Sequence, residues 1–153
     1  MSIVLQPIGT IRSTRKVVID DEWGKETATI ELDESKFTEE ALFGLNDFSH
    51  VIVVFYLDKV DVNKIELKAR HPRNNSNWPK VGIFAQRGKN RPNQIGITVC
   101  RVEEVNGTTL TVSGLDAIDN TPVLDIKPYM TEFGPNGKVR QPDWSKQLMK
   151  NYF

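Results

Sequence analysis

The clearest hydrophobic pattern in the chain is an alternation of apolar and polar residues, which predicts β-strands. Residues Thr27–Leu32 alternate in this way, and so do the runs Ile95–Val105 and Thr108–Leu115. The last two runs flank an Asn-Gly pair at 106–107, and such a pair between alternating runs predicts a tight hairpin. The run His50–Leu57 is β-branched and apolar, which predicts a central strand buried on both faces.

Weaker patterns predict the remaining strands. Lys64–Ala69 and Val81–Gln86 are short candidates, and Ile3–Ile11 is a longer one in which Pro7 suggests an edge position or a bulge. Many short strands with little helix predict a mostly β fold. We therefore expect a small barrel or a sandwich rather than a doubly wound sheet.

Two segments predict short helices. Thr38 stands before two glutamates, as an N-cap stands before an acidic first turn, so a helix should begin at Glu39 and end near Leu45. Asp143–Tyr152 predicts a closing helix, because large apolar side chains recur every fourth residue along one stripe and Pro142 precedes it.

Composition narrows the class of protein. The 153 residues are 39% apolar and 26% charged, which predicts one globular domain over residues 1–153. Lysine plus arginine equals aspartate plus glutamate at 20 each, so net charge does not indicate a polyanion partner. Cys100 is the only cysteine and the two histidines lie far apart, so we expect no disulfide and no metal site. The N-terminus lacks a signal-peptide pattern and the longest apolar run, Val51–Leu57, is too short for a membrane span, which favours a cytoplasmic location.

Two loops carry most of the candidate chemistry, and the first runs from Arg87 to Gly96. It holds three cations, two glycines, one proline and two asparagines between two predicted strands. Arginines on a stiffened backbone suit a carboxylate or phosphate, because the guanidinium donates hydrogen bonds in pairs. The alternative is a solvated hairpin loop.

The second loop runs from Leu115 to Tyr129 and places three acids within ten residues among apolar neighbours. Aspartates here suit ribose hydroxyls or an ammonium group. The alternative for 119–122 is an Asx turn. The alternative for Asp125 and Lys127 is an ion pair, since residues two apart in a strand point the same way.

A basic stretch from Lys64 to Arg91 contains eight cations and a single acid, Glu66. Trp78 and several asparagines lie among the cations, a combination typical of a nucleic-acid surface, although a solvated basic face fits the same pattern. Cys100 falls inside a predicted strand and is expected in the core. The chain has no glycine-rich dinucleotide motif, P-loop, nucleophile elbow or zinc-protease motif.

Several motifs, in order and at matching separations, resemble the TsaA-like (TrmO, formerly YaeB-like) family of S-adenosylmethionine-dependent tRNA methyltransferases. The resemblance runs nearly end to end. The segments that carry it are Pro7–Ser13, Leu45, Phe48–His50, Gly82–Arg87, Arg91–Asn93, Ile95–Gly96, Leu115–Asp116, Asp119, Thr121–Val123 and Asp125–Tyr129.

The resemblance implies a small β-barrel with one or two short helices that works as a homodimer, with the cofactor bound near the subunit interface. It implies methyl transfer to the N6 nitrogen of threonylcarbamoyladenosine, next to the tRNA anticodon. The residues implied to contact the cofactor are Trp23, Asp58, Lys59, Arg87, Ile97, Ile118, Asp119, Asn120 and Thr121. Those expected to contact the substrate are Arg73, Lys89, Arg91 and Asn93.

A carbamoylated N6 is a poor nucleophile, so removal of its proton would help the reaction. Asp125 and Tyr129 are the candidates for that role, with Lys127 as an electrostatic partner for a carbonyl or phosphate. No metal is required.

Some positions depart from the family pattern. Residues 88–90 replace a stretch that is usually small, then proline, then aromatic, and Gln94 stands where proline is usual. Asn120 replaces a glycine that permits positive φ, a conformation that asparagine tolerates. Longer members carry a C-terminal domain, and this chain ends at Phe153. Two alternatives therefore stay open: a methyltransferase on another nucleotide or small molecule, and a non-catalytic module that binds S-adenosylmethionine or RNA.

Overall fold

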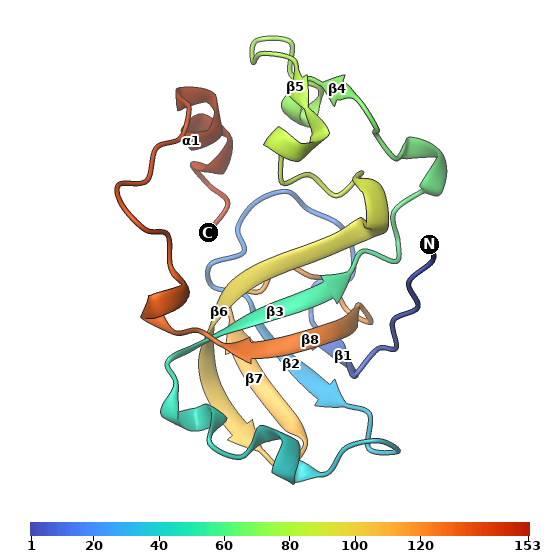
Figure 1. The fold of residues 1–153 in the computed structure, drawn as a ribbon, viewed down its shortest axis with the longest axis vertical. Coiled ribbons are helices and arrows are strands. Elements are labelled where there is room, and N and C mark those ends of the chain that lie inside the picture. The colour runs from blue at the N-terminus through green and yellow to red at the C-terminus, as the bar shows by residue number, and fades with distance from the viewer.

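The computed structural model describes residues 1–153, and its centre is a closed antiparallel barrel (Figure 1). Its strands are β1 (Gly9–Ser13), β2 (Thr27–Leu32), β3 (His50–Tyr56), β6 (Ile95–Asn106), β7 (Thr109–Ser113) and β8 (Pro122–Pro128). Around the ring the order is β1-β2-β7-β6-β3-β8, and β8 pairs with β1 to close it. The mostly β barrel fold is confirmed.

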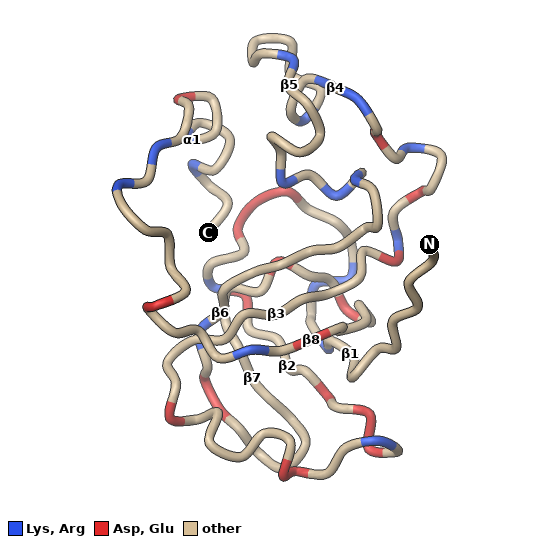
Figure 2. The backbone as a smooth tube through the Cα atoms, viewed as in Figure 1, with Lys and Arg blue, Asp and Glu red and all other residues tan.

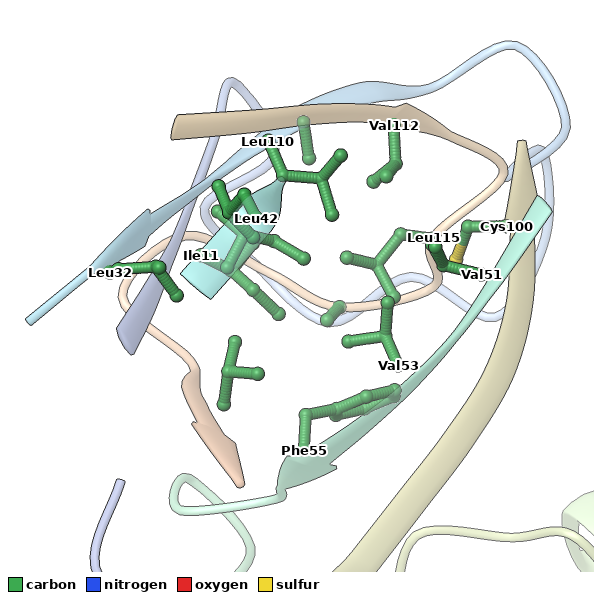
Figure 3. Packing of buried hydrophobic residues seen from close by; sticks show 14 residues of the cluster. Ile11, Leu32, Leu42, Val51, Val53, Phe55, Cys100, Leu110, Val112 and Leu115 are labelled. Carbon is green, nitrogen blue, oxygen red and sulfur yellow. The ribbon is translucent and has the colours of Figure 1, made fainter. Parts of the chain in front are cut away.

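The alternating strands point one set of apolar side chains into the barrel (Figure 3). In β3, Val51 and Val53 are fully buried and Phe55 nearly so, whereas Ile52 and Val54 between them are only half-buried. The prediction that this strand is buried on both faces is therefore wrong. No element of the chain packs over its outer face, so only one face joins the core.

The hairpin between β6 and β7 is confirmed, with its turn one residue further along than the Asn-Gly pair suggests. Asn106 pairs with Thr109 as the last residue of β6, which leaves Gly107 and Thr108 as the loop. Gly107 has a φ of +60°, and a positive φ at the first loop residue alone is the type II′ pattern.

Other boundaries differ from the predictions. The strand expected over Ile3–Ile11 begins only at Gly9. Ile8 still bonds to the Val123 carbonyl and the Asp33 amide, but the chain before it has no strand beside it, and Ile3 and Val4 are exposed. The helix expected from Glu39 to Leu45 is instead two short 3-10 turns, η1 (Glu39–Leu42) and η2 (Leu45–Asp47), separated where Gly44 takes a φ of +82°.

The two short strand candidates form only a small paired unit. β4 (Ala69–Arg70) pairs with β5 (Val81–Gly82), and the 3-10 turn η5 (Ile83–Ala85) follows directly. The remaining 3-10 turns are η3 (Val62–Lys64), η4 (Pro72–Asn74), η6 (Pro92–Gln94) and η7 (Thr131–Phe133). The closing helix is confirmed as α1 (Asp143–Met149), three residues shorter than expected.

The irregular segments gather at the two ends of the barrel. One end, which we call the loop end, carries residues 14–26 and 114–121, held together by the hydrogen bond from the Asp119 amide to the Arg15 carbonyl (2.8 Å). The β4–β5 unit and α1 lie beyond the barrel on one side, and η1 and η2 lie on the other (Figure 1). None of the helices has the length and apolar character that a transmembrane span requires.

Candidate functional site

The turn at 118–121 is fixed to the end of β1 by hydrogen bonds. The Asp119 carboxylate accepts from the Ser13 amide (2.9 Å) and from the Lys16 ammonium (2.6 Å). The hydrogen bond from Lys16, followed by that from the Ser13 amide, lowers the pKa of Asp119. Asn120 has a φ of +67°, so the left-handed conformation expected at this position is present.

The turn leaves few free groups to meet a ligand. The Thr121 side chain is buried and its hydroxyl donates to the Ile118 carbonyl (2.8 Å). The Asn120 side-chain oxygen accepts from Arg12. Among the predicted cofactor contacts in this turn, Asn120 alone is exposed, and Ile118 and Asp119 are half-buried.

Asp116 is the centre of a polar cluster that the sequence did not single out as a site. Its two carboxylate oxygens accept from the Thr98 hydroxyl and from the Tyr152 hydroxyl. Burial and then the Asp116 charge raise the pKa of Tyr152, and the charges of Arg87 and Arg73 oppose that rise. The signals for Asp116 were its place in the Leu-Asp motif at 115–116 and among the three acids of the second loop, and Tyr152 was visible only as part of an apolar stripe.

Arg87 lies against β6. Its guanidinium donates to the Ile97 carbonyl (2.7 Å), and its side chain is otherwise exposed. Ile97 is 48% exposed on the outer face of β6, and its neighbour Thr98 holds Asp116. Adjacent residues of one strand therefore hold Arg87 of the first loop and Asp116 of the second.

Trp23, a predicted cofactor contact, is packed away in this structure. It is only 3% exposed, and its indole N–H donates to the Ile19 carbonyl (3.1 Å). The Arg15 guanidinium stacks 3.9 Å above the ring centroid and also pairs with Glu26 (3.1 Å). The Trp23 amide donates to the Tyr152 carbonyl (2.7 Å).

Asp58 and Lys59, two further predicted cofactor contacts, follow the end of β3. They form an ion pair with each other (3.5 Å). No hydrogen bond or ion pair joins them to Arg87, Trp23 or the turn at 118–121.

The four predicted substrate contacts divide into two kinds. Arg73 pairs with Asp21 (2.9 Å), and Arg91 donates to the carbonyls of its own loop, including that of Gln86 (2.7 Å). These two guanidiniums therefore have structural partners. Lys89 and Asn93 are exposed and neither forms a side-chain hydrogen bond or ion pair in the chain. Lys89 stands within the altered stretch at 88–90.

Gly88, the first residue of that stretch, lies against another arginine. A Cβ at this position would come within 2.9 Å of a terminal nitrogen of Arg70. The Nε atom of Arg70 is buried and has no hydrogen-bond partner in the protein. The small residue at 88 thus leaves room for a guanidinium that the first loop partly covers.

The predicted catalytic residues lie on and just after β8. Asp125 and Lys127 form the ion pair expected along one strand face (3.2 Å), and both are about half exposed or more on the outside of the barrel. Asp125 is opposite Val54 in β3, and Val54 is opposite Ile97 in β6, so the three residues share one row across the outer face. The Tyr129 amide donates to the His50 carbonyl (2.9 Å), which ends the β8 pairing.

An apolar hollow of about 450 Å³ lies between β8 and the turns η1 and η2. Its lining includes Phe37, Leu42, Phe43 and Phe48 together with Asp125, one of the predicted catalytic residues, and none of the nine predicted cofactor contacts. No group of three or more His, Cys, Asp or Glu side chains gathers where it could hold a metal ion. The convergence of charged and polar groups is instead at the loop end.

The chain is similar to a family of known proteins. The sequence model of a family described as the tRNA-methyltransferase O N-terminal domain matches residues 15–134. The human tRNA (adenine(37)-N6)-methyltransferase is 41% identical over 113 residues, covering 74% of this chain and 25% of that protein. A putative S-adenosylmethionine-dependent methyltransferase of Pseudomonas aeruginosa is 38% identical over 135 residues, covering 85% of this chain and 56% of that protein. The chain thus spans between about a quarter and just over half of the length of these relatives.

Two further comparisons cover nearly all of this chain. A probable S-adenosyl-L-methionine-binding protein of Methanothermobacter thermautotrophicus is 34% identical over 139 residues, covering 90% of this chain and 97% of that protein. The crystal structure of TrmO from Pseudomonas aeruginosa superposes with a TM-score of 0.73 at 32% identity, covering 92% of this chain and 62% of that one.

Proposed function

The chain belongs to the TrmO N-terminal domain family, and from that premise we propose that it is an S-adenosylmethionine-dependent methyltransferase that acts on tRNA. The acceptor we propose is the N6 nitrogen of threonylcarbamoyladenosine beside the anticodon. The observation that carries the proposal is the junction at β6, where the Ile97 carbonyl holds Arg87 and the Thr98 hydroxyl holds Asp116. The two motif-bearing loops thus meet at one place.

The donor groups at this junction fit the proposed cofactor. Arg87 uses one N–H on Ile97, and its exposed guanidinium has further donors that suit the carboxylate of the methionine part. Ile97 and Ile118 offer apolar surface, and Asn120 offers an exposed amide. We propose that Trp23, Asp58, Lys59, Asp119 and Thr121 complete the contacts. When bound, S-adenosylmethionine supplies a methyl group on a sulfonium, and its transfer needs an in-line nucleophile about 3–3.5 Å away.

The acceptor side is proposed on the outer face of β8. Removal of the N6 proton makes the carbamoylated nitrogen a better nucleophile, and Asp125 or Tyr129 accepts that proton. Lys127 holds the Asp125 carboxylate in place through their ion pair and offsets negative charge at the acceptor's carbonyl or phosphate. Lys89 and Asn93 bind the substrate directly through exposed side chains. Arg73 and Arg91 must exchange or share their present partners to do so.

A second copy of the chain is proposed to complete the site. The outer face of β6 exposes Ile95, Ile97 and Val99 beside the half-buried Ile52 and Val54 of β3. A contiguous apolar row of this kind is typical of a surface that another protein covers. The row also contains Asp125, so pairing through this face places the proposed proton acceptor at the subunit interface.

The test combines binding with product analysis. At about 100 Kd of S-adenosylmethionine the folded protein should gain about 2.7 kcal/mol, seen as a rise in melting temperature. Labelled cofactor and tRNA that carries threonylcarbamoyladenosine should then yield labelled tRNA, with the methylated nucleoside identified by mass spectrometry. A melting shift without any product would favour a binding module. Turnover on another nucleotide or a small molecule, but not on tRNA, would favour the other alternative.

A further inference from the structure

The last residues of the chain lie alongside the loop end of the barrel. The amides of Glu22 and Trp23 donate to the carbonyls of Asn151 (2.8 Å) and Tyr152 (2.7 Å). A Cβ at Gly24 would come within 2.6 Å of the Phe153 backbone, so the glycine permits this close approach. Residues 151–153 are therefore held against 22–24 by two backbone hydrogen bonds, although they lie outside residues 15–134, which the family model matches.

The Tyr152 side chain fixes the same segment from the other side. Its hydroxyl donates to Asp116, the carboxylate that Thr98 also holds. A hydrogen bond to a charged acceptor is among the stronger ones in proteins. The segment is therefore anchored at the junction where Arg87 and Asp116 meet β6, while α1 above it is tied separately, by the hydrogen bond from the Trp78 indole to Gln147 (2.9 Å).

This arrangement conflicts with access to the proposed cofactor contacts. Trp23 is 3% exposed, with Arg15 stacked on its ring, and its amide is bonded to the C-terminal segment, so its side chain is closed to a ligand in this arrangement. Asp116 has both carboxylate oxygens occupied, one of them by Tyr152. The segment thus binds the backbone of Trp23 and the carboxylate of Asp116 at the place where the two motif-bearing loops meet.

We propose that Asn151–Phe153 is an autoinhibitory latch on the cofactor site, held by the Trp23 amide and the Asp116 carboxylate and displaced when S-adenosylmethionine binds. This inference rests on the cofactor assignment above. A ligand that needs the open state binds with an apparent Kd equal to its intrinsic Kd divided by the open fraction. Any change that loosens the latch therefore tightens cofactor binding.

The first test uses the wild-type protein and hydrogen–deuterium exchange. The amides of Glu22 and Trp23 are protected by the latch carbonyls, so their exchange should accelerate when S-adenosylmethionine is added to saturation. The amide of Leu32, which donates to the Thr108 carbonyl (3.0 Å) at the opposite end of the barrel, serves as an internal reference. Slower exchange at Glu22 and Trp23 with cofactor would show that the segment closes over the ligand, and would overturn autoinhibition.

The second test is Tyr152→Phe, which keeps the ring and removes the hydrogen bond to Asp116. We expect faster exchange at Glu22 and Trp23 without cofactor, and S-adenosylmethionine binding tightened by about 3- to 10-fold in calorimetry. Tyr56→Phe is the matched control, because its hydroxyl meets only Gln94 (3.3 Å), and it should leave both quantities unchanged.

The outcomes separate the latch from the function on which it rests. Unchanged or weaker cofactor binding by Tyr152→Phe, with clear binding by the wild type, would reject the latch and leave the cofactor assignment standing. Binding by neither protein would reject the cofactor assignment, and the latch would fall with it. If the variant unfolds, the exchange experiment on the wild type still decides.

Discussion

At the scale of single residues, backbone conformation and side-chain exposure have different physical origins. Asn120 was expected in a left-handed turn because asparagine tolerates positive φ, and it has that conformation. Trp23 and Thr121 were expected to contact a cofactor, and both are buried. Backbone preference is a local property of a residue type, whereas exposure depends on how other segments pack, as where the Arg15 guanidinium stacks on the Trp23 ring.

Arg87→Ala should weaken S-adenosylmethionine binding without unfolding the protein. The side chain is exposed and its one hydrogen bond is to the Ile97 carbonyl, so its loss opens no cavity in the core. Loss of a hydrogen bond to a charged ligand should raise the Kd about 10- to 100-fold in calorimetry. Arg101→Ala, also an exposed arginine, serves as the control. An unchanged Kd in the Arg87 variant would remove this residue from the cofactor site.

Cys100 should be inert to thiol reagents in the folded protein. Burial, followed by the nearby Asp116 charge, raises its pKa to about 12, and the side chain is 1% exposed. The thiolate is the reactive form, so at pH 8 the native thiol should not react with iodoacetamide and should do so fully in denaturant. Fast native labelling, measured by mass spectrometry, would show that this part of the barrel opens readily.

At the scale of elements, prediction succeeded where apolar and polar residues alternate without interruption. β2 was predicted residue for residue, and the β6–β7 hairpin was displaced by only one position. Val81–Gln86 failed as a strand after its first two residues because a local pattern does not specify a partner, and only Ala69–Arg70 is there to pair with it. The same reason explains the missing start of the strand at Ile3–Ile11.

The outer face of β6 is the surface through which we propose that two copies of the chain pair. If a second copy covers this face, Val99→Lys should separate the dimer, because a charge would then be buried against an apolar surface. Light scattering should change from twice 17.4 kDa to 17.4 kDa, with a melting transition retained. Val139→Lys, also at an exposed valine, is the control. A wild-type protein that is monomeric at high concentration would contradict the proposed dimer.

At the scale of the whole molecule, the distribution of charge indicates more about a polyanionic partner than the net charge of zero does. Cations follow the β4–β5 unit and the loop after it, at one end of the molecule (Figure 2). Lys64, Lys68 and Lys80 are exposed there and none forms an ion pair with an acid. Their stretch was identified from the sequence, but that Arg73 and Arg91 already have partners was visible only in the structure.

Binding of tRNA should therefore depend on these three lysines. With single-stranded RNA the log–log slope against salt changes by about 0.7 per phosphate contact, so replacing all three by glutamine should flatten it by about 2. S-adenosylmethionine affinity should stay unchanged. Replacement of Lys36 and Lys138, which lie outside the basic stretch, should leave the slope as it is. Equal slopes for the wild type and the triple variant would place the tRNA surface elsewhere.

The closure of the barrel has a consequence for how the chain folds. β1 meets β8 through two residue pairs, Gly9–Val123 and Thr10–Pro122, whereas every other neighbouring pair of strands in the ring matches five residues or more. This short seam joins the two neighbouring strands of the ring that lie furthest apart in the sequence. Its closure therefore costs much conformational entropy and gains few contacts in return. We expect it to form after the rate-limiting step in refolding. Substitutions that destabilise this seam should then increase the unfolding rate and leave the refolding rate nearly constant.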